Sequence, residues 1–193
     1  LDIIDLNPDF YTGTLHKWML APKGSSFLYV KKEYQNDIEP LVVSWGYESD
    51  FPGESQFLDY YEYQGTRDIS AFLCTPKVIE FLEENNWKEK AKACRKLVTD
   101  NYQDFCDLLN TKPLCPITEE FLGQMASIPI RTSKPLELKE MLYEKYKIQI
   151  PVMPLNGDIY LRYSINAYNS QDDLDVLHQA LTDIIKTTDL IEV

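Results

Sequence analysis

The segment from Asp158 to Tyr168, DIYLRYSINAY, alternates between apolar and polar positions and most constrains the fold. A period of two predicts a β-strand with one face on a core and the other turned away from it. The core-facing set is Ile159, Leu161, Tyr163, Ile165 and Ala167, and the polar set is Tyr160, Arg162, Ser164, Asn166 and Tyr168. The preceding turn, Asn156-Gly157-Asp158, joins this strand to a second apolar segment, IQIPVMP. These two segments predict two strands of a small sheet.

Two long amphipathic patterns accompany this sheet. From Trp87 the apolar residues recur at three-and-four spacing, which predicts a helix that ends before Pro113 and Pro116. Ser170 and Asp173 resemble a capping box, and Leu174, Leu177, Leu181 and Ile184 follow on one helical face. Both helices present an apolar stripe, so the sequence predicts that they cover the sheet.

Shorter elements complete the expected pattern. Ser70 is expected to cap one helix, and Ser133 to cap another that runs from Pro135 to about Tyr146. SIPIRT, at 127–132, is expected to be a short strand. The prediction for 70–193 is therefore an α+β arrangement in an α/β protein, with a small sheet covered by helices.

The N-terminal third has a different character. Residues 9–32 predict two strands around the turn Ala21-Pro22-Lys23-Gly24. Residues 34–68 look irregular and aromatic, and long irregular segments inside a domain are often functional. The residues around Trp45 and Tyr47 suggest one wall of a binding site. We therefore divide the chain into domains 1–69 and 70–193.

Composition excludes several functions. The net charge of -12 argues against a nucleic-acid backbone or an anionic membrane as the main partner, and no apolar run approaches membrane-spanning length. The four cysteines contain no C-x-x-C pair and the chain has only two histidines, so no metal site is predicted. Free thiols favour a cytoplasmic location. The chain begins LDIIDLNPDF without an initiator Met, so we expect either processing or a piece of a longer protein.

Lys17 is the first candidate for chemistry. It lies in TLHKWMLAPKGSSFLYV, between His16 and Trp18. A lysine amine forms a Schiff base with a carbonyl only when it is neutral, and burial among apolar side chains favours the neutral form. The alternative is a strand lysine that points to solvent, and spacing alone favours that alternative.

Three further positions could bind anions. Thr14 and His16 could donate to a phosphate, although His16 could equally be a half-buried structural histidine. Arg162 could hold a carboxylate through two parallel hydrogen bonds, or could belong to a solvated sheet face. The turn Gly65-Thr66-Arg67-Asp68 could meet an anion, or could be an ordinary turn in which Asp68 caps the next helix. PKGSS lacks the phosphate-loop pattern.

Four segments in one order resemble a known family. They are HKWMLAPKGSSFLYV, PLVVSWGY, YQGTRDISAFL and IQIPVMPLNGDIYLRYSINAYNSQDDLD. Together they resemble the class V aminotransferase superfamily of pyridoxal-phosphate enzymes, in particular its isopenicillin N epimerase-like branch. The resemblance covers nearly the whole chain but only the C-terminal portion of such a fold-type I enzyme. It implies that 1–69 is the end of the large cofactor-binding domain and that 70–193 is the small domain.

The resemblance implies a role for each candidate. Lys17 would form the Schiff base with pyridoxal 5'-phosphate, and His16 and Thr14 would belong to the cofactor pocket. Thr66 would reach the cofactor phosphate of the neighbouring subunit in a homodimer with a shared active site. Arg162 would bind the α-carboxylate of an amino-acid or related amine substrate. The expected reaction is epimerisation, transamination or lyase chemistry.

The sequence also departs from the family pattern. Cysteine desulfurases carry a reactive Cys shortly before the carboxylate-binding arginine, and IQIPVMPLNGDIYLR contains none. The acid that pairs with the cofactor's pyridine nitrogen, the stacking aromatic residue and a phosphate-binding turn would all precede Leu1. The alternative hypothesis is therefore a catalytically incomplete, truncated fragment or pseudo-enzyme that acts only as a folded interaction domain.

Overall fold

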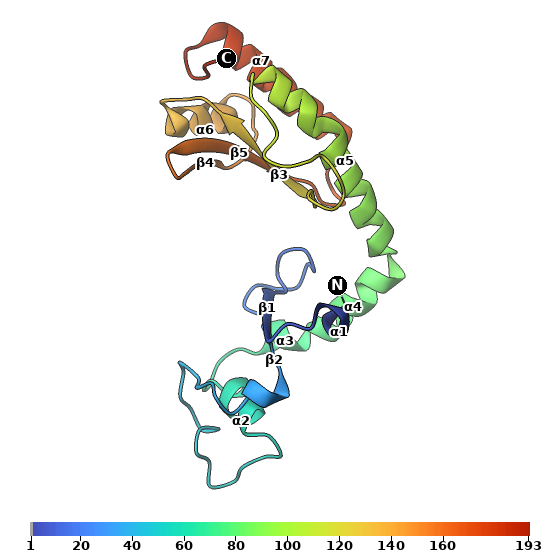
Figure 1. Ribbon diagram of the computed structural model, residues 1–193, viewed down its shortest axis with the longest axis vertical. Helices are drawn as coiled ribbons and strands as arrows, with labels where there is room; N and C mark the ends of the chain where they lie inside the picture. Colours follow the sequence, from blue (N-terminus) through green and yellow to red (C-terminus); the bar gives the residue numbers. More distant parts are fainter. Residues whose placement is uncertain (1) are drawn as a thin grey trace. The chain divides into compact units, whose positions relative to one another are not determined.

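The computed structural model describes residues 2–193, which divide into two compact units between Asn85 and Asn86 (Figure 1). The domain boundary predicted from the sequence lies between residues 69 and 70, and the two short helices α3 and α4 lie between these two positions. They are Ser70–Leu73 and Thr75–Glu84. The assignment of each unit to a domain of a complete enzyme stays a prediction.

The first unit contains a two-stranded antiparallel ribbon. Strands β1, Phe10–Thr14, and β2, Ser26–Val30, pair from Phe10 opposite Val30 to Thr14 opposite Ser26, which confirms the two predicted strands. Gly13 lies opposite Phe27, and a Cβ at Gly13 would come within 2.8 Å of the Phe27 ring. The glycine therefore lets the aromatic ring lie across the neighbouring strand.

The other elements of the first unit are short. Helix α2, Gln56–Glu62, lies within residues 34–68, which were expected to be irregular. The expectation is wrong for the residues of this helix. Ser55 precedes it, and its Oγ accepts from the backbone N–H of Leu58 at 3.3 Å. Ser70 was expected to cap a helix but is instead the first residue of α3, after Ile69. The remaining bounds are α1 Ile3–Leu6, the 3-10 helix η1 Lys32–Tyr34 and α2 Gln56–Glu62.

The second unit is a three-stranded antiparallel sheet with three helices. The strand order is β3-β5-β4, so β5 is central and the other two strands are edges. Figure 1 shows α5, α6 and α7 gathered on one side of this sheet. This is the small sheet covered by helices that the sequence predicted. The bounds are α5 Trp87–Leu108, β3 Met125–Ile130, α6 Pro135–Glu144, β4 Val152–Leu155, β5 Asp158–Ser164 and α7 Gln171–Thr187.

Both edge strands contain a proline, and the sheet pairing explains why each is tolerated. The Ile165 N–H donates to Gln124 and the Arg162 N–H donates to Pro151, so alternate residues of β5 turn their backbone groups toward opposite edges. Pro129 and Pro154 lie opposite Tyr160 and Ile159 at positions where the edge strand's own N–H would face away from β5. A proline, which has no N–H, therefore costs no ladder hydrogen bond at either place.

The predicted helix caps have mixed outcomes. The capping box of α7 is confirmed, with the Ser170 N–H donating to Asp173 Oδ2 at 3.0 Å. The cap of α6 by Ser133 is wrong, because the residue before this helix is Lys134 and its N–H bonds to Thr132 Oγ1. A Ser or Thr hydroxyl can accept from the N–H two residues further along the chain, and spacing alone did not distinguish the two hydroxyls.

One hydrophobic core fills the second unit. It joins the inward residues of the three strands, including Ile128, Leu161 and Val152, to buried residues of all three helices. Cys94 and Cys106 belong to it, and burial raises the pKa of both thiols. Cys74 is half-buried. The residues in the described range that form the helical part of this core are Cys94, Val98, Tyr102, Phe105, Cys106, Leu138, Leu142, Leu174, Leu177, Ala180, Leu181 and Ile184.

No helix in residues 2–193 is both long enough and apolar enough to cross a membrane. The same residues contain no group of three or more His, Cys, Asp and Glu side chains that could hold a metal ion.

Candidate active site

The loop between β1 and β2 carries three of the predicted site residues. Thr14 ends β1, and the chain then folds back so that the Leu15 N–H donates to the Ser25 carbonyl at 3.2 Å. The Ala21 N–H donates to the Leu15 carbonyl at 3.0 Å, which closes a smaller loop around Lys17. Leu15, Ala21 and Ser25 are buried. The backbone at His16 and Lys17 is therefore held by bonds on both sides of these residues.

His16 and Lys17 have different surroundings within this loop. His16 is half-buried, and its Nδ1 is buried without a hydrogen-bond partner among the described residues. Lys17 and Thr14 are exposed. The apolar neighbourhood expected around Lys17 is incomplete, because Trp18 and Leu20 are 42% and 38% exposed. In the described residues, burial therefore does not isolate the amine from water.

Arg162 lies in the middle of the central strand of the second unit. Its backbone N–H donates to Pro151, and its side chain is half-buried on the face opposite Leu161 and Tyr163. The buried Nε has no hydrogen-bond partner, and no carboxylate within residues 2–193 forms an ion pair with this guanidinium. An unpaired, partly buried arginine is notable in a chain with 31 acidic residues. Such a group is suited to an anion supplied from outside the chain.

The Gly65–Asp68 turn has the geometry of a helix-capping turn. Asp68 Oδ1 accepts from the N–H and the hydroxyl of Ser70, at 2.8 and 2.6 Å, and these bonds lower the pKa of Asp68. Arg67 donates to Gln64 at 2.6 Å and lies 5.0 Å above the ring of Phe72. This geometry favours the alternative interpretation for Asp68. Thr66 is exposed, and its proposed contact with a phosphate stays a prediction.

The structure groups the predicted site residues by unit. Thr14, His16 and Lys17 share one loop of the first unit, and Thr66 belongs to the same unit. Arg162 belongs to the second unit. The ring centroid of His178 lies 5.8 Å from that of Phe105 in the core.

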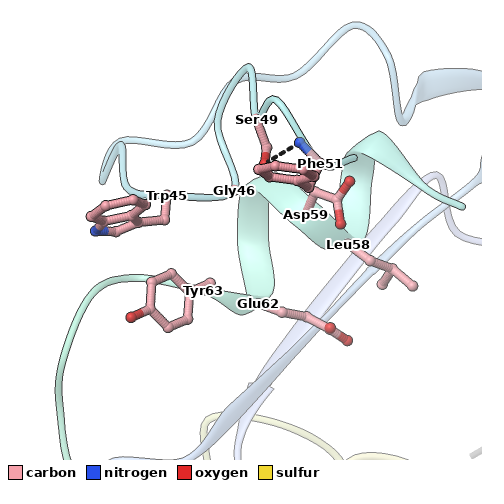
Figure 2. A pocket seen from close by; sticks show the side chains of 8 residues that line it. All are labelled: Trp45, Gly46, Ser49, Phe51, Leu58, Asp59, Glu62 and Tyr63. Atoms are coloured by element: carbon pink, nitrogen blue, oxygen red, sulfur yellow. Dashed lines mark hydrogen bonds between the residues drawn. The ribbon is translucent and has the colours of Figure 1, made fainter. Parts of the chain in front are cut away.

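A pocket of about 350 Å³ lies in the first unit (Figure 2). Figure 2 shows loop side chains on one side and α2 side chains on the other. Trp45 and Phe51 are 85% and 92% exposed, and Asp59 Oδ2 already accepts from the Gly53 N–H at 2.8 Å. The pocket is therefore shallow, and none of the cofactor-binding or substrate-binding residues predicted from the sequence lines it. Its lining residues are Trp45, Gly46, Ser49, Phe51, Leu58, Asp59, Glu62 and Tyr63.

The family model described as "Aminotransferase class-V" matches residues 1–177. This match covers most of the chain and agrees with the resemblance found in the sequence. The chain belongs to the class V aminotransferase family.

Known proteins support this assignment. Isopenicillin N epimerase of Streptomyces clavuligerus is 34% identical over 197 residues, which cover 94% of this chain and 48% of that protein. The chain thus spans about half the length of the curated relatives that it matches.

Solved structures share the fold. An apo cysteine desulfurase from Thermococcus onnurineus NA1 matches with a TM-score of 0.77 at 18% identity, covering 95% of this chain and 48% of that one. A mutant of C-DES, in which glycine is covalently linked to the PLP cofactor, matches with a TM-score of 0.66 at 18% identity, covering 95% and 48%. The mixed α/β fold, with small sheets and helices, is therefore that of about half of a cysteine desulfurase chain.

Proposed function

We propose that this chain supplies the lysine and the carboxylate-binding arginine of a pyridoxal-phosphate enzyme that acts on an amino acid or a related amine. The observation that carries the proposal is the pair of buried polar atoms without partners, His16 Nδ1 and Arg162 Nε. Both belong to residues that the family resemblance assigns to the site, and buried polar groups normally have partners. A bound cofactor and its substrate would provide them.

The residues present fit this cofactor. Lys17, exposed on a loop closed by backbone hydrogen bonds, would be the covalent attachment point. Thr14, at the end of β1, and Thr66, in the neighbouring subunit of a homodimer, would each offer a hydroxyl to the phosphate. When bound, pyridoxal phosphate takes up the electron pair released as a bond to the substrate's α-carbon breaks.

The chain's own residues would then control binding and proton movement. Arg162 would hold the substrate carboxylate through two N–H groups, which fixes the direction in which the α-carbon faces. The amine of Lys17, once displaced, would carry a proton to or from that carbon. His16 would form a hydrogen bond to the bound cofactor through Nδ1 and so help to orient it. Epimerisation is favoured by the similarity to isopenicillin N epimerase, and transamination and lyase chemistry are the alternatives.

A second candidate function is a folded interaction domain without activity of its own. It is favoured by exposed apolar side chains in the first unit, such as Leu41, Trp45 and Phe51. The chain spans about half the length of its relatives, so the activity of a complete enzyme remains part of the proposal. The four free cysteines support a cytoplasmic location in either case.

Titration with pyridoxal phosphate tests the proposal. We expect the purified chain to develop a visible absorption band that Lys17→Ala abolishes and Lys23→Ala retains, because Lys23 is an exposed lysine of the same loop. Borohydride reduction followed by peptide mass mapping should locate the adduct on Lys17. A folded sample that gives no band, or a band that survives Lys17→Ala, would support the interaction-domain function instead.

A further inference from the structure

We propose that Ser127 binds the substrate carboxylate together with Arg162, so that the hydroxyl and the guanidinium form one two-residue clamp. The inference rests on the proposed function, because it concerns the carboxylate that Arg162 would hold. Ser127 lies in β3 and was not identified as a site residue from the sequence. Its position follows from how β3 pairs with β5.

Ser127 is directly opposite Arg162 in the antiparallel pair. The Arg162 N–H donates to Pro151 on the other side of β5, so Arg162 turns its backbone groups away from Ser127. The two residues therefore form a non-hydrogen-bonded pair, the kind in which side chains approach most closely. Residues directly opposite one another lie on the same face of a sheet, so the Ser127 side chain projects from the same face as that of Arg162.

The backbone of Ser127 is held firmly in this place. Its carbonyl points to the outer edge of the sheet and accepts from the hydroxyl of Tyr102 at 2.8 Å. That hydroxyl also accepts from the N–H of Leu114 at 3.1 Å, and Tyr102 is buried in the core. A helix of the core thus fixes the strand position from which the Ser127 side chain projects. Such support reduces the ordering cost of binding a ligand.

The side chains around Arg162 leave the hydroxyl available for a ligand. In residues 2–193 the Ser127 Oγ forms no hydrogen bond with the protein. The residue on the other side of Arg162, Pro151, offers no polar side-chain group. A carboxylate has two oxygens that each accept more than one hydrogen bond, so it can take two bonds from Arg162 and one from Ser127.

The clamp selects for a carboxylate. A guanidinium alone would bind a phosphate, a sulfate or a carboxylate. The serine hydroxyl on the neighbouring strand adds a single donor, which suits a small planar anion. The amino acids that the proposed enzyme would bind carry this group. The same clamp would disfavour amines in which an amide replaces the carboxylate, because an amide is neutral and its nitrogen does not accept.

Nuclear magnetic resonance titration of the whole chain tests the clamp. The probe is L-alanine, and L-alaninamide is the matched ligand without a carboxylate. We expect L-alanine, but not L-alaninamide, to shift the Arg162 Nε–H and Ser127 amide signals. Ser127→Ala should raise the Kd about tenfold, the effect of losing one hydrogen bond to a charged group. Ser127→Thr should restore binding to within about twofold, and the exposed Ser133→Ala should leave the Kd unchanged.

The outcomes separate this inference from the proposed function. If Arg162→Gln abolishes binding but Ser127→Ala binds L-alanine with unchanged Kd, Ser127 is not part of the clamp and the role of Arg162 stands. If L-alanine and L-alaninamide shift the wild-type signals equally, or neither does, the carboxylate site itself is wrong. Attachment of the cofactor at Lys17 is measured separately by absorbance, so its success or failure is independent of either result.

Discussion

The two units bury their apolar side chains in very different ways. The second has a continuous core that links its three strands to its three helices. In residues 2–85 the buried apolar residues are Leu15, Ala21 and Val30, all from the ribbon and its loop. Many large apolar side chains of the first unit remain exposed, including Leu41, Trp45 and Phe51.

This difference indicates how each unit is stabilised. Burial of apolar surface is the main favourable contribution to folding, so the second unit should account for most of the free energy of unfolding. The first unit is organised by ladder hydrogen bonds, close aromatic pairs such as Tyr47 with Tyr60, and local caps. The lysine loop therefore sits in the less stable unit and Arg162 in the more stable one.

The largest expected effect is the loss of a core side chain. Leu161, in the central strand, is 0% exposed, and Leu161→Ala should lower the free energy of unfolding by about 2–5 kcal/mol. Leu41→Ala removes the same atoms from a residue of the first unit that is fully exposed. This substitution should change the free energy of unfolding by less than about 0.5 kcal/mol. Urea unfolding followed by circular dichroism measures both. Equal losses would show that the units do not differ in this way.

A smaller effect is expected at the hydroxyl of Tyr102. Tyr102→Phe leaves the Ser127 carbonyl and the Leu114 N–H without their partner and should cost about 1–3 kcal/mol. Tyr34 in the first unit stacks on Phe10 through its ring, at 5.6 Å, so Tyr34→Phe keeps this contact and should be close to neutral. The same unfolding measurement compares them. A neutral Tyr102→Phe would mean that β3 is not anchored by this hydroxyl.

The loss of a helix cap should also have different effects in the two units. Ser170→Ala removes one side of the α7 capping box and should lower the free energy of unfolding by about 1 kcal/mol. Ser55→Ala removes the cap of α2 and should act only locally, since α2 has no buried residue. Hydrogen exchange at the Leu58 amide should rise in the second variant while the global unfolding transition stays in place. A shift of that transition would show that α2 belongs to the cooperative core.

The second unit could be predicted well from the sequence because each element has one buried face. Burial of one face produces the alternation of apolar and polar residues in 158–164. It also produces the three-and-four spacing of apolar residues in 87–108 and 171–187. Helix α2 was missed for the opposite reason. It contains no buried residue, so its sequence, QFLDYYE, has no apolar stripe to reveal a helix. Its position is fixed by tertiary contact, since a Cβ at Gly46 would collide with the Asp59 carbonyl.

The candidate site could be predicted only in part. Residue order and family resemblance suggested Lys17 and Arg162, but neither could indicate that His16 Nδ1 and Arg162 Nε lack partners. Ser127 could not be found at all, because its place beside Arg162 depends on the β3–β5 register and on which backbone groups face outward. Register becomes visible only when the strands are paired.

The smallest expected effect is the loss of a surface ion pair. Lys134 bonds to Asp189 at 2.8 Å in the second unit, and Lys31 bonds to Asp9 at 2.7 Å in the first. The Lys134 bond lowers the pKa of Asp189 and raises that of Lys134. The pair is therefore fully stabilising between the unfolded values of 3.8 and 10.5. This stabilisation is lost as the pH falls through the lowered pKa of Asp189, or rises through the raised pKa of Lys134.

Lys134→Gln and Lys31→Gln together test whether the effect of an ion pair on unfolding depends on the unit in which it lies. In low salt near neutral pH, Lys134→Gln should shift the unfolding midpoint of the second unit slightly downward. The shift should vanish in 1 M salt, where charges are screened over about 3 Å, and at a pH below the lowered pKa of Asp189. Lys31→Gln should leave that midpoint unchanged, because its ion pair joins residues that flank one end of the ribbon in the other unit. If Lys31→Gln shifted the midpoint as much as Lys134→Gln, the two units would unfold together despite their different cores.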